Sequence, residues 1–206
     1  MRRAALFDVD CREFNAVGDG LAFRPRVEPL ADKLRALYDC AARHGLPLVF
    51  STCWSGRMLQ PDSLPGVLFV PLDPSRREWL DGLDAARLIY VEKRTYDKPG
   101  LNYACRAFDI FANSSNAARL ALTLAVEEWV VFGNGFDLCV NGVVRGLLAT
   151  GRKVRLLEDV TWASAEGYGD HGETGTPTNR RRILDEMAAL GVRLETGASF
   201  LAEMAS

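Results

Sequence analysis

The sequence predicts an α/β fold of three layers, in which helices cover both faces of a mainly parallel central sheet. Short apolar runs rich in β-branched and aromatic residues alternate along the chain with segments whose apolar residues recur at helical spacing. Polar residues suited to chemistry follow several of these apolar runs. The carboxyl ends of parallel strands meet at one edge of an open sheet, which is where such folds bind ligands.

Composition favours a single domain over residues 1–206, without nucleic-acid or membrane partners. The 206 residues are 48% hydrophobic, enough for a real core, and the net charge of −2 comes with no basic stripe. No apolar run reaches membrane-spanning length. Five widely spaced cysteines with no CxxC pair argue against a zinc knuckle or a disulfide framework, and they predict a reducing, cytoplasmic location. Because there are only two histidines, we expect no multi-histidine metal site, and we expect no cofactor.

The amino-terminal segments predict a strand, a long helix and a second strand. Residues 4–9 form a buried apolar run, and residues 27–44 carry apolar residues at helical spacing. Those apolar residues are Leu30, Leu34, Leu37 and Ala41. Gly45 then ends the helix in a left-handed conformation, so residues 46–51 form the next strand.

The middle of the chain predicts short strands separated by long loops. Residues 67–70 and 87–91 are brief apolar runs, which are typical of buried strands. Two prolines mark residues 55–66 as a loop. Residues 95–113 mix polar, aromatic and glycine residues, which indicates a long functional loop or a short helix within one.

Helices and strands alternate again in the last part of the chain. Ser114 or Ser115 can cap a helix over residues 116–126. Strands are predicted at residues 128–132, 154–157 and 192–195, and helices at residues 140–149 and 180–190. Residues 166–179 are polar and glycine-rich, which predicts a mobile loop or lid.

Three of the predicted strand ends carry residues suited to catalysis. Cys139 lies where a strand passes into a helix, whose amino end lowers a thiol pKa, so it is a candidate nucleophile; the alternative is a buried structural cysteine. Asp8 and Asp10 end the first strand, and at this spacing they are expected to share one face. Asp10 lies nearer the carboxyl edge and is the better catalytic candidate. Lys93 follows the strand at residues 87–91 and reaches the same edge.

The motifs around these residues resemble the isochorismatase-like cysteine hydrolases, the superfamily that includes nicotinamidases and N-carbamoylsarcosine amidase. Residues 133–140 (GNGFDLCV) resemble the family segment G-x-x-x-D-x-C-V, and residues 8–14 (DVDCREF) resemble its first-strand signature D-x-Q-x-D-F. Residues 93–96 (KRTY) resemble the segment that bears the family lysine, and residues 151–159 resemble a later strand motif. The resemblance runs from Ala4 to about Thr196, and so covers most of the chain.

The resemblance implies a catalytic triad of Asp10, Lys93 and Cys139. Cys139 would attack a carbonyl carbon and form a thioester, Asp10 would move the proton, and Lys93 would hold the thiolate. The backbone N–H groups of Gly135 and Cys139 would form the oxyanion hole. The family also implies a cis peptide between Asn134 and Gly135.

Several departures from the family pattern narrow these expectations. Arg12 replaces the glutamine of the first motif, and the spacing from Asp10 to Phe14 is one residue short, which leaves Asp8 as an alternative base. Residues 51–55 (STCWS) lack the aspartate and histidines with which nicotinamidases bind zinc, so we expect neither zinc nor nicotinamidase activity. Isochorismatases proper lack the cysteine, so we do not expect isochorismate hydrolysis. The candidates for substrate contact are Trp54, Arg57, Tyr96 and Phe136.

The expected function is metal-independent hydrolysis of an amide or carbamoyl C–N bond in a small non-peptide molecule. A second hypothesis is hydrolysis of another carbonyl derivative through the same thioester intermediate. The alternative from a different class is a catalytically silent family member that binds a metabolite or a partner protein. The resemblance also implies a homodimer or homotetramer.

Overall fold

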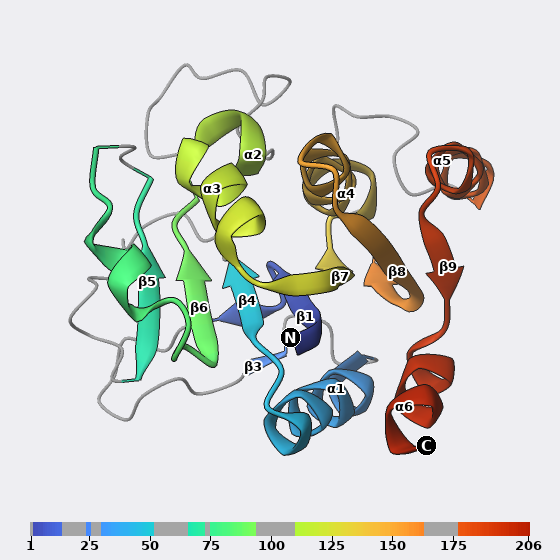
Figure 1. Cartoon of the computed structure of the whole chain (residues 1–206). Coiled ribbons are helices and arrows are strands. Elements are labelled where there is room, and N and C mark those ends of the chain that lie inside the picture. The colour runs from blue at the N-terminus through green and yellow to red at the C-terminus, as the bar shows by residue number, and fades with distance from the viewer. Residues whose placement is uncertain are drawn as a thin grey trace.

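Seven parallel strands form one continuous sheet, in the order β5-β6-β4-β1-β7-β8-β9 (Figure 1). The computed structural model describes residues 2–13, 24–25, 30–51, 66–72, 75–93, 110–162 and 177–206. The sheet strands are β1 (Arg2–Val9), β4 (Leu48–Ser51), β5 (Val67–Val70), β6 (Leu88–Val91), β7 (Val126–Asn134), β8 (Lys153–Trp162) and β9 (Arg193–Glu195). A separate antiparallel pair consists of β2 (Arg12–Glu13) and β3 (Arg24–Pro25).

Helices cover both faces of the sheet, which confirms the predicted three-layer fold with a parallel sheet. The helices are α1 (Ala31–His44), α2 (Ile110–Asn113), α3 (Ser115–Thr123), α4 (Asn141–Ala149), α5 (Pro177–Ala189) and α6 (Gly197–Ala205). Helices α1 and α6 lie together on one face, and the other helices lie on the opposite face (Figure 1). A 3₁₀ turn, η3 (Glu78–Gly82), packs near β5, and a π-helical turn, η4 (Phe136–Val140), leads into α4.

Alternation along the central strand β1 builds two separate hydrophobic cores. Phe7 and Val9 point into the core under α2 to α5, where the Phe7 and Trp129 rings lie 5.9 Å apart. Ala4 and Leu6 point into the smaller core beneath α1 and α6. Because both faces of β1 are buried, the strand is apolar nearly throughout, and any polar residue in it needs a specific partner.

The described boundaries follow the sequence predictions in outline. Strands β7 and β8 are longer than the predicted strands at residues 128–132 and 154–157, and the helices differ in three places. Residue 126 already belongs to β7, so α3 ends earlier than predicted, at Thr123. Helix α5 begins at Pro177, inside the predicted loop, because proline suits a first helical position where its missing N–H is not needed. Helix α6 was not predicted, although Thr196 caps it by accepting a hydrogen bond from the Ser199 N–H. The Ser114 cap is confirmed by its bond from the Ala117 N–H.

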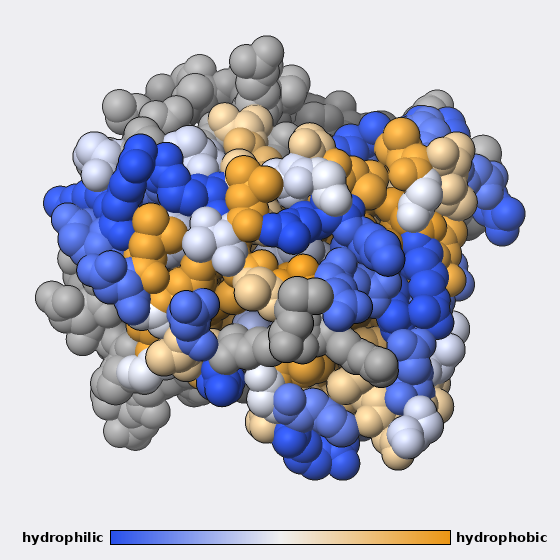
Figure 2. Space-filling model, in the orientation of Figure 1, coloured by the Kyte–Doolittle hydropathy of each residue, from blue (hydrophilic) through white to orange (hydrophobic). Residues whose placement is uncertain are grey.

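The surface carries hydrophobic residues in small groups. On the face shown in Figure 2, hydrophilic and hydrophobic residues are interspersed. Among the described residues, the exposed large hydrophobic side chains are Leu122, Trp162 and Leu190. Scattered apolar residues of this kind are ordinary on a protein surface. No helix in the described ranges is long and apolar enough to cross a membrane.

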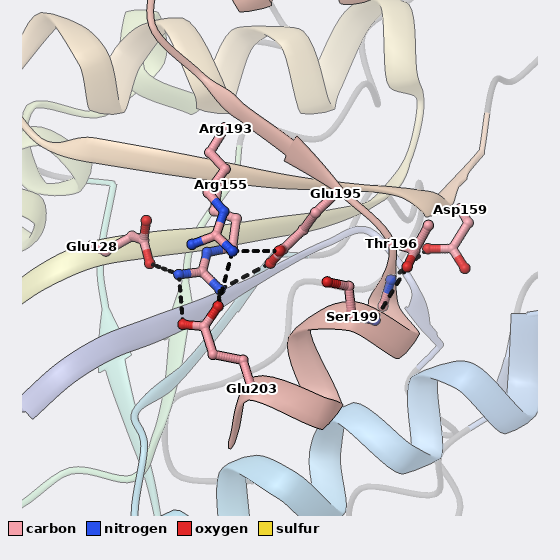
Figure 3. A network of polar contacts seen from close by, with 9 residues as sticks. Glu128, Arg155, Asp159, Arg193, Glu195, Thr196, Ser199 and Glu203 are labelled. Carbon is pink, nitrogen blue, oxygen red and sulfur yellow. Dashed lines mark hydrogen bonds and ion pairs between the residues drawn. The ribbon is translucent and has the colours of Figure 1, made fainter. Parts of the chain in front are cut away.

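A buried arginine connects α6 to the sheet at the amino-terminal end of β8 (Figure 3). Arg155 on β8 pairs with Glu128 at 2.6 Å, Glu195 at 2.9 Å and Glu203 at 3.1 Å. Burial opposes the charged form of Arg155, but its carboxylate partners raise its pKa overall. Its hydrogen bond in turn lowers the pKa of Glu203. The Arg155 side chain also lines a cavity of about 450 Å³ at this end of the sheet.

Removing Arg155 should destabilise the fold without touching the opposite edge of the sheet. In Arg155→Met the Glu195 side chain, 7% exposed, loses its buried cation and keeps only the exposed Arg193 at 3.0 Å. We expect the free energy of unfolding to fall by about 3 kcal/mol. Urea unfolding at pH 7 measures this loss. The matched control is Arg145→Met, which breaks the exposed pair with Glu186 and should cost less than about 1 kcal/mol. Equal losses in the two variants would contradict a structural role for burial of the Arg155 charge.

Candidate active site

Four strand ends meet at the carboxyl edge of the sheet. The strands β6, β4, β1 and β7 are neighbours in that order. Ser51 is the last residue of β4, Asp10 directly follows β1, and Lys93 follows β6 by two residues. Cys139 lies in η4, which directly follows the turn at the end of β7. Strand order therefore brings together residues that are as much as 129 positions apart in the sequence (139 − 10).

The structure brings Asp10, Lys93 and Cys139 into direct contact. The Lys93 Nζ lies 2.5 Å from Asp10 Oδ2 and 3.2 Å from Cys139 Sγ. Ser51 Oγ donates a hydrogen bond of 2.9 Å to the other oxygen, Asp10 Oδ1. All four residues are buried, with 1% to 5% of their surface exposed. Each ion that folding removes from water here has a charged or hydrogen-bonding partner, which offsets the cost of burying it.

Asp10 is held in a left-handed backbone conformation. Its φ is 56°, and it is the only described residue other than glycine with a positive φ. This conformation costs a non-glycine residue about 1–2 kcal/mol, and aspartate tolerates it better than most. It ends the alternation of β1, and the side chain of Asp10 meets Lys93 and Ser51.

The expectation that Asp8 and Asp10 share one face is wrong. Asp8 Oδ2 accepts a hydrogen bond of 2.5 Å from the Tyr38 hydroxyl on α1, and Asp8 Oδ1 accepts one of 3.2 Å from the Cys11 N–H. The prediction assumed extended backbone throughout, and the positive φ at Asp10 breaks that assumption. Lys93 contacts Asp10, so the geometry favours Asp10 over Asp8 as the acid that works with the thiol.

Two glycines let the chain turn closely around the thiol. Gly133 has a φ of +139°, and a Cβ there would come within 2.2 Å of the Val9 carbonyl oxygen on β1. Gly135 has a φ of +75°, and a Cβ there would meet Cys139 Sγ at 3.2 Å. Neither position accepts a larger residue without moving β7 away from β1 or displacing the sulfur. These glycines therefore set the place of Cys139 beside Lys93.

The expected cis peptide between Asn134 and Gly135 is wrong, because this bond is trans. The left-handed conformation of Gly135 turns the chain at this point instead. The Gly135 N–H donates a hydrogen bond of 2.9 Å to the Asn134 side-chain oxygen. A role for the Gly135 and Cys139 N–H groups as an oxyanion hole stays a prediction. It requires a substrate oxygen to replace the Asn134 side-chain oxygen as the acceptor of the Gly135 N–H.

A buried acid accompanies the thiol in the same turn. Both carboxylate oxygens of Asp137 are buried, and no hydrogen-bond partner for them lies among the described residues. A negative charge at the amino-terminal end of a helix is favoured by the helix dipole, and η4 continues directly into α4. These oxygens remain available as hydrogen-bond acceptors two residues before Cys139.

Of the residues predicted to contact substrate, the structure describes Phe136. Phe136 is 1% exposed, and the Arg180 guanidinium lies 4.7 Å from its ring centroid. Its role as a substrate contact stays a prediction. Trp54, Arg57 and Tyr96 lie outside the described residues, as do the predicted loops at residues 95–109 and 166–176.

Sequence reasoning missed Ser51 and Tyr38 as parts of the site. Ser51 ends a predicted strand, so its place at the carboxyl edge could have identified it. Tyr38 follows Leu34 by four residues, on the face of α1 that packs on the sheet. Its hydroxyl group on an otherwise apolar face was the available signal.

Cys11 and Cys40 differ from Cys139 in their surroundings. Burial raises the pKa of the Cys11 thiol well above its ordinary value, and the charge of Asp8 raises it further. Burial also raises the pKa of Cys40. Both thiols are therefore protonated at neutral pH, whereas the Cys139 sulfur lies against the Lys93 ammonium. Cys53 and Cys105 lie outside the described residues.

No metal-binding cluster is evident in the described ranges. No group of three or more histidine, cysteine, aspartate or glutamate side chains there could hold a metal ion. Residues 52–55, which belong to the segment in which we expected no zinc ligands, are outside those ranges. The absence of a resident metal stays a prediction.

Solved structures match almost the whole chain. No protein-family model matches, and no curated protein sequence does. A pyrazinamidase from Pyrococcus horikoshii in complex with zinc is 16% identical, with a TM-score of 0.58 over 94% of this chain and 99% of that one. N-carbamoylsarcosine amidase from Thermoplasma acidophilum is 18% identical, with a TM-score of 0.53 over 95% and 96%. An isochorismatase family protein from Desulfovibrio vulgaris is 16% identical, with a TM-score of 0.54 over the full length of both chains.

The chain has the isochorismatase-like hydrolase fold. The structural similarity thus confirms the fold that the motif resemblance implied. The similarity to the Desulfovibrio vulgaris protein runs over the full length of both chains. The candidate triad lies at the carboxyl edge of the sheet, where open α/β folds bind ligands.

Alkylation should distinguish Cys139 from the other described thiols. At pH 7.5 we expect iodoacetamide to modify Cys139 at least about 10-fold faster than Cys11 or Cys40, because thiolate and not thiol is the nucleophile. Peptide mapping by mass spectrometry follows each cysteine separately. In Lys93→Met the advantage of Cys139 should disappear. Uniform labelling of the wild-type chain would contradict an activated thiol.

Proposed function

We propose that this chain is a cysteine hydrolase that cleaves an amide or carbamoyl C–N bond in a small non-peptide molecule. The observation that carries the proposal is the bridging position of Lys93, 2.5 Å from Asp10 and 3.2 Å from Cys139. A protein that only binds a ligand has no need for a buried lysine between an acid and a thiol. The amidases that share the fold support the same chemistry.

In the proposed first step, Cys139 Sγ attacks the carbonyl carbon of the substrate. Asp10 takes the thiol proton, and the Lys93 ammonium stabilises the sulfur as its negative charge develops. The carbonyl oxygen becomes an oxyanion. The backbone N–H groups of Gly135 and Cys139 are the proposed donors to it, and a single such donor contributes about 3 kcal/mol to a typical transition state.

Collapse of this tetrahedral intermediate breaks the C–N bond. The leaving nitrogen takes the proton from Asp10, and the acyl group stays on Cys139 as a thioester. A water molecule then attacks the thioester, with Asp10 accepting its proton. That proton returns to the departing sulfur, which restores the thiol and releases the acid. The residues alternate between two protonation states, so no external oxidant or metal enters the balance.

Ser51 supports these steps from the side away from the lysine. Its hydroxyl donates to Asp10 Oδ1, while Lys93 donates to Asp10 Oδ2. Both carboxylate oxygens are therefore fixed, one by a donor from β4 and the other by a donor that follows β6. Fixing a general base in this way avoids its reorientation during the reaction. A homodimer or homotetramer and a cytoplasmic location remain predictions alongside this function.

Substitution of the nucleophile tests the proposal directly. In Cys139→Ser we expect ammonia release from small primary amides and carbamoyl compounds to fall by roughly 10³-fold or more, because a serine has no comparably acidic proton for Asp10 to take. The control is Cys40→Ala, which removes a buried thiol on α1 that is no member of the candidate triad and should keep turnover within about 2-fold of wild type.

Two results would contradict the proposal. Full turnover in Cys139→Ser would exclude the thioester. Absence of turnover by the wild-type chain over the whole panel, together with an unreactive Cys139, would favour the catalytically silent alternative. Thermal-shift screening with the same compounds would then identify what binds.

A further inference from the structure

We propose that Asp8 and Tyr38 are positioning residues that hold Asp10 in its working conformation. This inference rests on the proposed function, in which Asp10 moves the proton of the Cys139 thiol. Asp8 and Tyr38 would act only through the backbone turn at Asp10, since neither is expected to touch the substrate.

The contacts form a chain from α1 to the turn. The Tyr38 hydroxyl donates to Asp8 Oδ2 at 2.5 Å, and Asp8 Oδ1 accepts the Cys11 N–H at 3.2 Å. Cys11 directly follows Asp10, whose φ is 56°. The hydrogen bond from the Cys11 N–H to the Asp8 carboxylate therefore bridges the two sides of Asp10. The side chain of Asp8 thus closes a tight turn around Asp10, as aspartate side chains do when they bond to backbone a few residues ahead.

The turn needs such a contact because the ladder of β1 ends there. Val9 is the last residue of β1 in register with both β4 and β7, and the Asp10 N–H still donates to the Ser51 carbonyl at 3.2 Å. The next N–H, that of Cys11, has left the sheet and is buried. Asp8 accepts its hydrogen bond, which removes the penalty for leaving this donor unpaired and favours the left-handed conformation at Asp10.

A purely structural explanation accounts poorly for an acid at this position. Asp8 is 0% exposed and lies two residues beyond Leu6, which packs into the core beneath α1. An apolar residue there would avoid the cost of burying a carboxylate. Tyr38 is itself fixed, because its ring packs 6.4 Å from that of Phe132 and its helix is anchored by Leu34 and Leu37.

Loss of the contacts of Asp8 with Tyr38 and Cys11 should change the ionisation of the Cys139 thiol, although neither Asp8 nor Tyr38 is a member of the triad. When the turn loosens, the Asp10 carboxylate is no longer held against Lys93, and the Lys93 ammonium loses the partner that fixes it 3.2 Å from Cys139 Sγ. Among the described residues, the charged and titratable groups near the thiol are Lys93, Asp10 and, in the same turn as Cys139, Asp137; Asp8 and Cys11 lie behind Asp10. Thiolate formation should then need a higher pH although every member of the triad is present.

The test compares Tyr38→Phe with wild type by the rate of Cys139 alkylation with iodoacetamide between pH 5.5 and 10. Tyr38→Phe removes one hydroxyl and keeps the ring that packs on Phe132. We expect its rate at pH 6.5 to fall by about 3- to 10-fold, a shift of roughly half to one pH unit, and to rejoin the wild-type rate near pH 10. Asp8→Asn should shift the profile in the same direction. The double variant should equal the more impaired single variant, since the two residues act as one unit.

The matched control is Lys33→Met, which removes a different polar contact of α1, the 2.8 Å pair with Asp159. Its profile should coincide with that of wild type. An equal shift in Lys33→Met would overturn the inference, because any loosening of α1 would then suffice. Thermal unfolding of each variant shows that the comparison is made on folded protein, and Asp8→Asn decides the question if Tyr38→Phe does not fold.

Asp10→Asn separates failure of this inference from failure of the proposed function. If Asp10→Asn changes the profile while Tyr38→Phe and Asp8→Asn leave it unmoved, the positioning role is wrong and the proposed function stands. If Asp10→Asn also leaves the profile unmoved, Asp10 does not govern the thiol, and both the inference and the triad are wrong.

Discussion

The buried positive charge of Lys93 is the constraint on which the rest of the site depends. An ammonium group with 2% of its side chain exposed is stable only if anionic or accepting groups surround it. Asp10 supplies one such group from β1, and the sulfur of Cys139 lies on its other side. The same charge that must be compensated for folding therefore lies against the sulfur that acts as the nucleophile in the proposed mechanism. Folding and the proposed chemistry therefore both require Lys93 to lie between Asp10 and Cys139.

The order of strands in the sheet brings these groups together. Neighbouring strands lie about 5 Å apart, so side chains at adjacent carboxyl ends reach one another directly. Lys93 comes from β6, which is separated from β1 only by β4, and Ser51 fills that intermediate position. A lysine is long enough to cross the intervening strand, whereas the short side chains of Ser51 and Asp10 meet between neighbours. The lengths of the side chains thus match their places in the sheet.

Much of this arrangement could be predicted from the sequence, because buried parallel strands leave a plain apolar signal. The strand Val67–Val70 has the predicted bounds, and the strands that bear Asp10, Lys93 and Cys139 were all identified. The conformation of Asp10 could not be predicted, since a positive φ at aspartate depends on contacts with Asp8 and Ser51 that form only in the folded chain. Helix α6 was missed for a similar reason. Its anchor is Glu203, whose partner Arg155 is 48 residues away in the sequence.

The close approach of Gly133 to Val9 has a consequence for how this chain can diversify. With a carbonyl oxygen 2.2 Å from where a Cβ would stand, the backbones of β1 and β7 are locked together at the point where acid and thiol emerge. The spacing of the reacting groups is therefore fixed by main-chain packing and is insulated from most changes elsewhere. A substitution at Gly133 would therefore alter the separation of these two strand ends even though its side chain is not among the proposed reacting groups.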